Sequence, residues 1–173
     1  SDSAIKESAV KYEKDGDGIV VLTLDDPTAS ANTMNELYGR SMDEAVTRLE
    51  SEKDSITGVV LTSAKKSFFA GGDLHLLGQV DDSNTAETAA RIDHLKSLFR
   101  RMEMLGRPVV AAINGAALGG GLEVALAAHH RVALPQLAQP RTEHLLPDAR
   151  GVLDDALLLH RVDAGDDRGG RER

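Results

Sequence analysis

Alternating and clustered apolar residues predict two strands near the start of the chain. Val10–Lys14 reads V-K-Y-E-K and Ile19–Leu24 reads I-V-V-L-T-L, and the intervening D-G-D-G is typical of a tight turn. Gly16 and Gly18 are expected to adopt the positive φ angles that such turns need.

Two longer segments have the periodicity of amphipathic helices. The first helix is predicted to begin near Thr33, because Thr33 and Glu36 have the spacing of a capping box. The second is expected to end at about Gly106, since Pro108 follows. Apolar residues recur along one face of each helix: Met34, Leu37, Tyr38, Ala45, Val46 and Leu49 in the first, and Leu95, Leu98, Phe99, Met102 and Leu105 in the second.

Two short apolar runs, 56–62 and 108–114, are rich in valine and isoleucine, as buried strands are. Strands and helices thus alternate along the first 133 residues. This alternation predicts a single α/β domain with a largely parallel sheet.

Composition narrows the possible partners and chemistry. A formal charge of −8 argues against nucleic-acid binding, which needs clustered Lys and Arg. The absence of cysteine excludes a disulfide framework, a thiolate nucleophile and a cysteine–zinc site. The chain has no apolar run of transmembrane length, and its first residues lack the apolar core of a signal peptide. We therefore expect a cytoplasmic protein that does not bind membranes.

The amino-acid composition of the chain changes near residue 134. Residues 134–173 contain no Lys, Ile, Phe, Tyr, Met, Asn or Ser, and they end D-D-R-G-G-R-E-R. A short helix is expected at 153–162, and disorder over the last eleven residues. Translation of a GC-rich gene in a shifted reading frame tends to give such a composition, so one hypothesis is a change of reading frame near Ala133. The alternative hypothesis is a divergent C-terminus. Sequencing the coding DNA separates the two.

Two segments share a layout in which a buried strand leads through small residues into a predicted helix. They read A-G-G-D-L at 70–74 and A-L-G-G-G-L-E at 117–123. Glycine lets a backbone amide face a ligand, and an amide at a helix N-terminus also carries the positive end of the helix dipole. Two converging amides would form an oxyanion hole, and Glu123 would lie within reach of the ligand as an acid or base.

Structural explanations of the same residues remain open. Gly119, Gly120 and Gly121 would also permit close helix–strand packing, and Gly71-Gly72 with Asp73 would also make a turn and an N-cap. Neither G-x-G-x-x-G nor G-x-x-x-x-G-K-[ST] occurs, and no serine lies in a G-x-S-x-G elbow, which disfavours a phosphate loop and a hydrolase triad.

Taken together, these segments resemble the crotonase family of enoyl-CoA hydratases and isomerases. The resemblance covers about residues 10–133 and rests on D-D-P-x-x-x-A-N-T-M, S-F-F-A-G-G-D-L and R-P-V-V-A-A-I-N-G-A-A-L-G-G-G-L-E. It is strongest to the hydratase portion of multifunctional fatty-acid oxidation proteins. The fold this implies is the ClpP/crotonase spiral of ββα units, truncated here to residues 1–133 and followed by an atypical tail at 134–173.

The resemblance also implies roles for particular residues. The amides of Gly72 and Gly120 match the pair that holds the thioester oxygen, and Glu123 matches the first of two catalytic glutamates. The second glutamate has no clear counterpart: Glu143 has the expected offset, but R-T-E-H does not match the family motif. The residues that match substrate-contacting positions are Ser30, Ala31, Ala70, Asp73, Leu74 and His75.

The function implied is hydration of a trans-2-enoyl-CoA to a 3-hydroxyacyl-CoA in fatty-acid β-oxidation. No metal or redox cofactor is implied, since coenzyme A is part of the substrate. A complete family domain would form a homo-oligomer or join a β-oxidation complex. The alternatives are another crotonase reaction, such as isomerisation or thioester hydrolysis, and an inactive module that binds acyl-CoA or another subunit.

Overall fold

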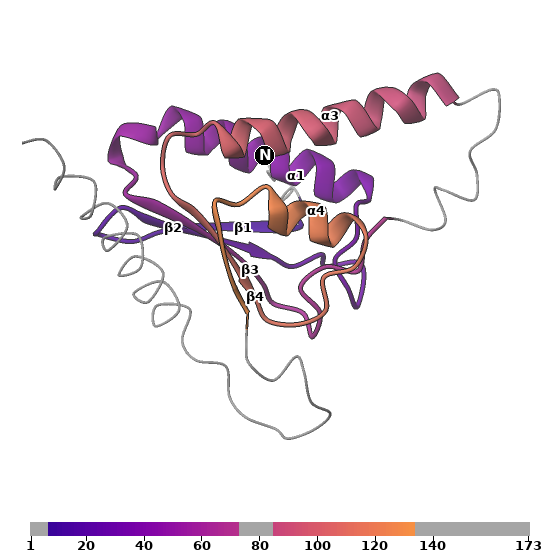
Figure 1. The fold of residues 1–173 in the computed structure, drawn as a ribbon, viewed down its shortest axis with the longest axis horizontal. Helices are drawn as coiled ribbons and strands as arrows, with labels where there is room; N and C mark the ends of the chain where they lie inside the picture. Colours follow the sequence, from indigo (N-terminus) through magenta and orange to yellow (C-terminus); the bar gives the residue numbers. More distant parts are fainter. Residues whose placement is uncertain (1–6, 73–84, 134–173) are drawn as a thin grey trace, which may run out of the picture.

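A mixed β-sheet forms the centre of the structure, a computed structural model that describes residues 7–72 and 85–133. In these ranges the sheet has five strands in the order β1-β2-β3-β4-β5 (Figure 1). The strands are β1 (Val10–Lys14), β2 (Ile19–Leu24), β3 (Gly58–Ser63), β4 (Val109–Ile113) and β5 (His130–Ala133). The predicted α/β domain with a largely parallel sheet is confirmed, because only the β1–β2 pair is antiparallel.

The turn between β1 and β2 needs one positive φ angle rather than two. Gly18 has φ = 79°, and a Cβ on it would lie 2.6 Å from the carbonyl oxygen of Ser55. Gly16 has no positive φ and open space around its Cα, so the prediction for Gly16 was wrong. The turn is instead closed by Asp15, whose carboxylate accepts from the amides of Asp17 and Ile19.

The helices lie together on one face of the sheet (Figure 1). They are α1 (Glu36–Ser51), the 3₁₀ turn η1 (Lys53–Ser55), α3 (Thr85–Glu103) and α4 (Gly120–Leu126). Arg101 of α3 reaches Asp43 and Glu50 of α1, each at 2.7 Å. These partly exposed ion pairs contribute little stability individually, but together they fix how the two helices align.

The start of α1 differs from the prediction by two residues. Asn35, not Thr33, is the N-cap: its backbone is extended and its Oδ1 accepts from the amide of Tyr38 at 2.8 Å. Met34 therefore lies outside the helix, and its backbone bonds to the loop at Gly71 instead. The tertiary contact at Met34 explains why capping-box spacing alone placed the boundary too early.

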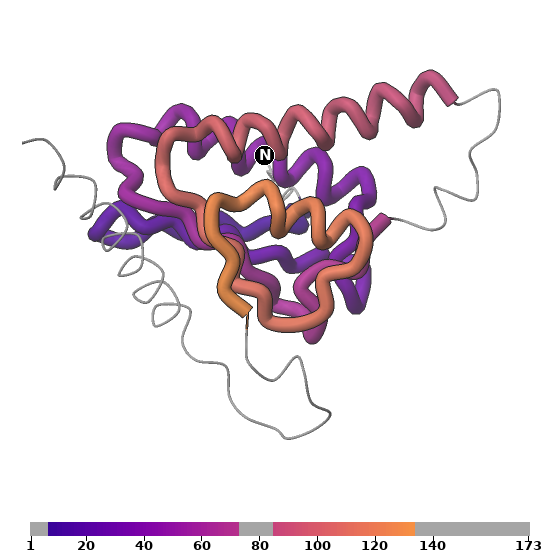
Figure 2. The backbone as a smooth tube through the Cα atoms, in the orientation of Figure 1, coloured from indigo at the N-terminus to yellow at the C-terminus, as the bar shows by residue number. Residues whose placement is uncertain are grey.

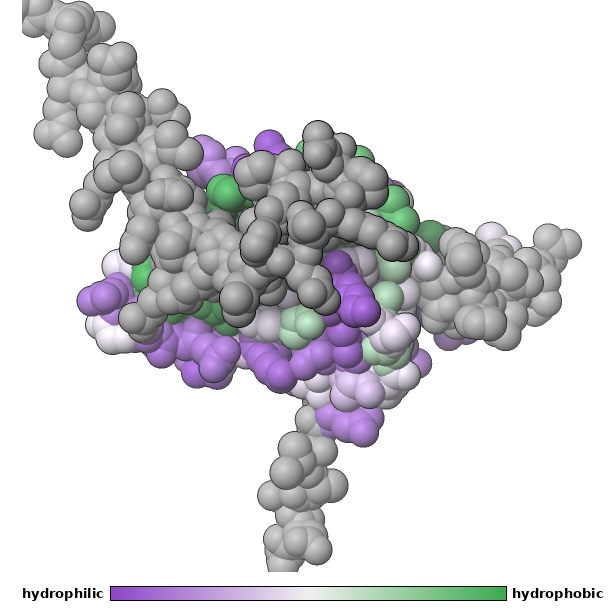
Figure 3. Space-filling view, turned by 90° about the horizontal axis from the view of Figure 1, so that it is seen from below, coloured by the Kyte–Doolittle hydropathy of each residue, from purple (hydrophilic) through white to green (hydrophobic). Residues whose placement is uncertain are grey.

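The main core lies between the helices and the sheet. Alternate strand residues face it, so Val59 and Leu61 belong to this core whereas Val60 packs with Ile19 and Ala112 on the other face. The side chains fully buried in the main core include Leu22, Tyr38, Met42, Leu49, Phe68, Phe69, Leu98 and Met102. The opposite face, viewed in Figure 3, carries hydrophobic residues (green) among hydrophilic ones (purple).

Several sequence-based expectations fall outside the described ranges. These are the helix expected at 153–162, the tail at 134–173 and the three residues that follow Gly72. Among the residues that the structure does describe, no helix has the length and apolarity needed to cross a membrane.

Candidate active site

The two glycine segments meet at the carboxyl edge of the parallel strands. Segment 64–72 follows β3, segment 114–119 follows β4, and Figure 2 shows them side by side. Phe69 joins them: its amide donates to Ala116 O and its carbonyl accepts from Leu118 N, both at 3.1 Å. Carboxyl ends of parallel strands gather at one edge, so residues 47 to 49 positions apart in sequence become neighbours.

These segments require glycine at two positions, Gly71 because of close backbone contact and Gly119 because of its positive φ. Gly71 has φ = 99°, and a Cβ on it would lie 2.8 Å from the carbonyl oxygen of Leu118. Gly119, with φ = 50°, is the N-cap of α4, and a Cβ on it would lie 3.9 Å from Gly71 Cα. The prediction of a helix directly after the second glycine segment is thereby confirmed.

The amides of Gly72 and Gly120 are among the donors that the hydrogen bonds of this junction do not use. Gly72 pairs with Met34 through a parallel bridge in which Met34 N donates to Gly71 O at 2.9 Å. The first hydrogen bonds of α4 are donated by Gly121, Leu122 and Glu123. Within residues 7–72 and 85–133, neither Gly72 N nor Gly120 N donates to an acceptor.

Gly121 has a packing role, as the structural explanation of the glycine run proposed. A Cβ on Gly121 would lie 2.5 Å from the carbonyl oxygen of Phe69 and 2.8 Å from its Cβ. Phe69 is fully buried and packs edge-to-face against Tyr38, with ring centroids 4.9 Å apart. The three glycines therefore have different roles. Gly119 is the N-cap of the helix, Gly120 has an amide that donates to no described acceptor, and Gly121 allows close packing.

Glu123 lies in the first turn of α4, on its exposed side. Val124 and Ala125 face the core, whereas Leu122 and Leu126 are 50% and 57% exposed. The carboxylate thus stands beside exposed leucines rather than in an apolar enclosure made by the described residues. The sequence placed Glu123 correctly in the first turn of the helix that follows the glycines, and among the described residues Glu123 is exposed.

The other residues expected to contact substrate are only partly in view. Ala70 lies next to the Gly71–Gly72 bend, and its amide donates to Asn32 O at 2.8 Å. Ser30 is exposed and Ala31 is half-buried in the adjoining loop. Asp73, Leu74 and His75 lie outside the described residues.

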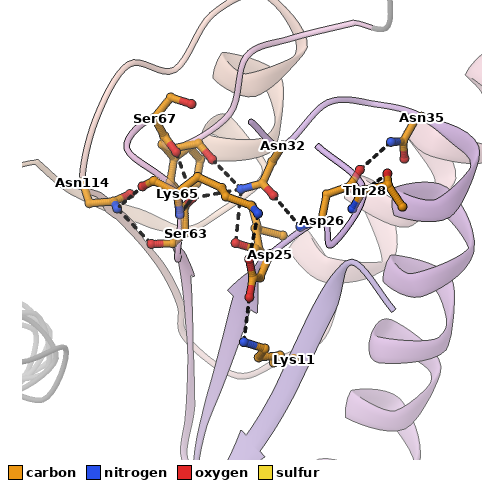
Figure 4. A network of polar contacts seen from close by, with 12 residues as sticks. Lys11, Asp25, Asp26, Thr28, Asn32, Asn35, Ser63, Lys65, Ser67 and Asn114 are labelled. Carbon is orange, nitrogen blue, oxygen red and sulfur yellow. Dashed lines mark hydrogen bonds and ion pairs between the residues drawn. The ribbon is translucent and has the colours of Figure 1, made fainter. Parts of the chain in front are cut away.

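Asn32 is the centre of a polar network that sequence reasoning missed (Figure 4). Its side chain is 2% exposed; Oδ1 accepts from Asp26 N at 3.0 Å, and Nδ2 donates to Ser63 Oγ at 2.9 Å. Nδ2 also lies 3.2 Å from Leu24 O and 3.3 Å from Phe68 O. Asn32 therefore ties the loop after β2 to the loop that carries Gly72.

The same network extends to β4 and to the surface (Figure 4). Asn114 Nδ2 donates to Ser63 O at 2.9 Å and to Lys65 O at 3.1 Å. Asp25 pairs with Lys11 at 2.6 Å and with Lys65 at 3.0 Å, and both cations hold the pKa of its carboxyl below the ordinary value. All three loops at the carboxyl edge are thus fastened to one another.

Asp26 supports the network from a buried position. Burial by itself raises the pKa of Asp26, but hydrogen bonds from the Thr28 hydroxyl and amide and from the Asn35 side chain outweigh it. The pKa therefore lies below the ordinary 3.8. Since Asn35 also caps α1, Asp26 links the start of that helix to the loop.

We expect this depressed pKa to make stability depend on acid pH. The unfolded chain takes up a proton on Asp26 near pH 3.8 while the folded chain stays ionised, so the free energy of unfolding falls as pH falls through this range. Asp26→Asn should lose about 1–3 kcal/mol at pH 7 and show a shallower decline below about pH 4. Urea unfolding between pH 3 and 7 measures both, with exposed Asp17→Asn as control; parallel curves for wild type and Asp26→Asn would contradict the assignment.

A hollow at the opposite, amino edge of the sheet is lined by Gly106, Arg107, Pro108, His129 and His130. His129 Nδ1 accepts from Val109 N at 3.0 Å and its Nε2 lies 2.9 Å from Glu103 O. These partners require the tautomer protonated at Nε2, in which His129 joins the end of α3 to the start of β4. This arrangement explains His129 as a structural residue far from the glycine loops.

Comparison with known proteins identifies relatives of the chain in sequence and in structure. A family model described as "Enoyl-CoA hydratase/isomerase" matches residues 14–151. The chain is 43% identical over 128 residues to "Fatty acid oxidation complex subunit alpha" of Idiomarina loihiensis and 42% identical over 127 residues to the protein of that name from Shewanella frigidimarina. These matches cover 73% of this chain but 18% of each relative.

Solved structures support the same fold. An enoyl-CoA hydratase from Bacillus anthracis superposes with a TM-score of 0.64 at 27% identity, covering 73% of this chain and 47% of that one. DspI from Pseudomonas aeruginosa superposes with a TM-score of 0.62 at 30% identity, covering 77% and 52%. The chain therefore spans about half of these structures and about a fifth of the curated relatives.

Proposed function

Because the chain belongs to the enoyl-CoA hydratase/isomerase family, we propose that it binds an acyl-CoA thioester at the junction of its two glycine loops and adds water to a trans-2-enoyl-CoA. The observation that supports this proposal is that the amides of Gly72 and Gly120, one on each loop, are not used in the hydrogen bonding between the two loops. The expected resemblance to the crotonase family is confirmed by the matches of sequence and fold.

The two amides would act on the thioester carbonyl. Donating to its oxygen draws electrons from the conjugated double bond and makes C3 electrophilic. When the hydroxyl oxygen of water bonds to C3, negative charge moves to the thioester oxygen, where two fixed donors stabilise it more than mobile water would. Backbone amides held by the network around Asn32 need little reorganisation during this step.

Glu123 would act on the water. Its place three residues after Gly120 puts the carboxylate on the same helical turn as the second amide. In the proposed reaction Glu123 accepts a proton from water as the C3–O bond forms and then returns this proton to C2, which completes the 3-hydroxyacyl-CoA. The net change is the addition of one water molecule, which transfers no electrons and so uses no redox cofactor.

The names of the relatives suggest the metabolic setting. The curated relatives are called subunits of a fatty acid oxidation complex, which supports fatty acyl-CoA as the substrate class and assembly with another subunit as a further proposal.

Hydration of crotonyl-CoA, followed by loss of enoyl thioester absorbance, tests the reaction. Glu123→Gln should lower kcat by roughly 10²–10⁴-fold, which is the usual contribution of general-base assistance. The matched control is Glu36→Gln, since Glu36 is an exposed acid in the first turn of α1 as Glu123 is in α4. Equal rates for wild type and Glu123→Gln would contradict the role of Glu123.

One observation favours a second function, a module that binds acyl-CoA without turning it over. Glu123 is exposed among the described residues, and a general base acts best where water access is controlled. Calorimetric titration with butyryl-CoA, which has no double bond, separates the two. Binding of butyryl-CoA without hydration of crotonyl-CoA supports the module, and absence of binding contradicts both functions.

A further inference from the structure

Met34 contacts both loops whose amides are assigned to the thioester oxygen. Its amide donates to Gly71 O at 2.9 Å, and its backbone forms a parallel bridge with Gly72. Its side chain lies over the other loop, since a Cβ on Gly120 would be 2.6 Å from Met34 Sδ and 2.7 Å from Cε. One residue therefore holds Gly72 by its backbone and Gly120 by its side chain.

The surroundings leave Met34 little freedom to move away. It is half-buried and packs against the main core, directly before the N-cap Asn35. Two residues earlier, Asn32 O accepts from Ala70 N, so segment 32–34 is hydrogen-bonded to segment 70–72 at both ends. The backbone of Met34 is thus fixed relative to Gly72, and its thioether extends from that fixed point to Gly120.

From these contacts we infer that Met34 is a positioning residue that sets the separation between the amides of Gly72 and Gly120. The two loops also touch through the backbone, at Gly71 with Gly119 and at Phe69 with Ala117, and through the side chain of Asn114, which donates to Lys65 O. Met34 adds a side chain from a third segment, which contacts both loops of this junction. The effect of Met34 on the polarisation of a bound thioester rests on the proposed function, whereas its effect on the separation of the two amides does not.

The side-chain chemistry suits this task. A thioether has three rotatable bonds and a polarisable sulfur, so it keeps contact with a neighbouring backbone that moves slightly. Removing it by Met34→Ala leaves Gly120 without its neighbour, and the distance between the donors is then free to vary. Oxyanion stabilisation depends steeply on donor geometry, so even small variation should weaken polarisation of a carbonyl. Met34→Leu keeps most of the volume and should retain most of the effect.

A ligand-free measurement tests the spacing directly. In protein with ¹³C-methyl methionine, a nuclear Overhauser effect is expected between the Met34 methyl group and Gly120. Met34→Ala should shift the amide resonances of both Gly72 and Gly120, Met34→Leu should shift them less, and Met104→Ala, at a methionine 63% exposed, should leave them in place. If Gly120 is unaffected by Met34→Ala in a protein whose circular dichroism is native, the inference is overturned.

A second measurement uses a chromophoric thioester, 4-dimethylaminocinnamoyl-CoA, whose absorbance moves to the red when its carbonyl is polarised. Wild type should give a red shift, Met34→Ala should lose at least half of it, and the affinity for free coenzyme A should change by less than about twofold, since coenzyme A lacks the carbonyl. A full red shift in Met34→Ala overturns the inference and leaves the proposed function standing. If wild type gives no red shift, while Met34→Ala still shifts the amide resonances of both Gly72 and Gly120, the proposed function is overturned and the spacing role of Met34 is supported.

Discussion

Asn32→Ala is expected to lower the free energy of unfolding by about 3–5 kcal/mol, because it leaves several buried polar groups without partners at once. The amide of Asp26, the hydroxyl of Ser63 and the carbonyl of Phe68 all bond to the Asn32 side chain. Each unsatisfied group costs about 1–3 kcal/mol when water cannot reach it. Ser63 retains its bond to Ser67, which keeps the total from being a simple sum.

Urea unfolding followed by circular dichroism measures this loss. Asn35→Ala is the matched control, since it removes one N-cap bond and one bond to Asp26 and should cost about 1–2 kcal/mol. A loss in Asn32→Ala no larger than that in Asn35→Ala would show that the network does not hold the loops together. An intermediate loss with an unchanged m-value would indicate that water replaces the missing amide.

Gly121→Ala is expected to destabilise the protein by about 3 kcal/mol, against the usual benefit of alanine in a helix. Alanine normally stabilises a helical position by about 0.5–1 kcal/mol relative to glycine. Here its Cβ would meet the carbonyl oxygen of Phe69 at 2.5 Å and the Phe69 Cβ at 2.8 Å. Both belong to a fully buried residue that is bonded to the neighbouring loop, so α4 would have to move outward.

Gly16→Ala is the control for this substitution, because nothing lies within 4 Å of a Cβ there and its φ is not positive. It should change the free energy of unfolding by less than about 0.5 kcal/mol. Thermal unfolding of both variants gives the comparison. Equal stability of Gly121→Ala and wild type would mean that α4 is not packed on Phe69 as described.

Periodicity predicted the elements well, because the main core follows from which faces are apolar. Val10–Lys14 and Ile19–Leu24 were placed with the bounds observed, and Leu98 and Met102 face the core as the spacing of three and four required. The end of the second long helix was placed three residues late: α3 ends at Glu103, while Leu105 is still buried beyond it. Because Leu105 is buried although it lies beyond the helix, the apolar pattern continued past the last helical residue. Apolar periodicity reports which side chains are buried and does not show where the helical backbone ends.

The glycine positions of the site were predictable, but the residues that arrange them were not. Gly72, Gly120 and Glu123 carry a pattern that can be recognised locally. Asn32 and Met34 contact residues about 30 to 90 positions away. Asn32 has no periodic signal, and the periodic pattern that included Met34 assigned it to the helix face rather than to these contacts. A buried asparagine within S-A-N-T-M-N was indistinguishable from a loop asparagine, since both are polar residues beside small ones.

The order of the strands has a consequence for synthesis on the ribosome. Each strand of the described sheet pairs with the strand made just before it, so none must wait for a later segment to be inserted between existing neighbours. The nascent chain can therefore extend the sheet at one growing edge as it emerges, with β1 and β2 as the starting pair. The two glycine loops follow β3 and β4 and are therefore made one after the other. The junction between them can close only once β4 has joined β3. Arrest of translation before residue 118 should accordingly release a nascent chain with its sheet begun and this junction still open.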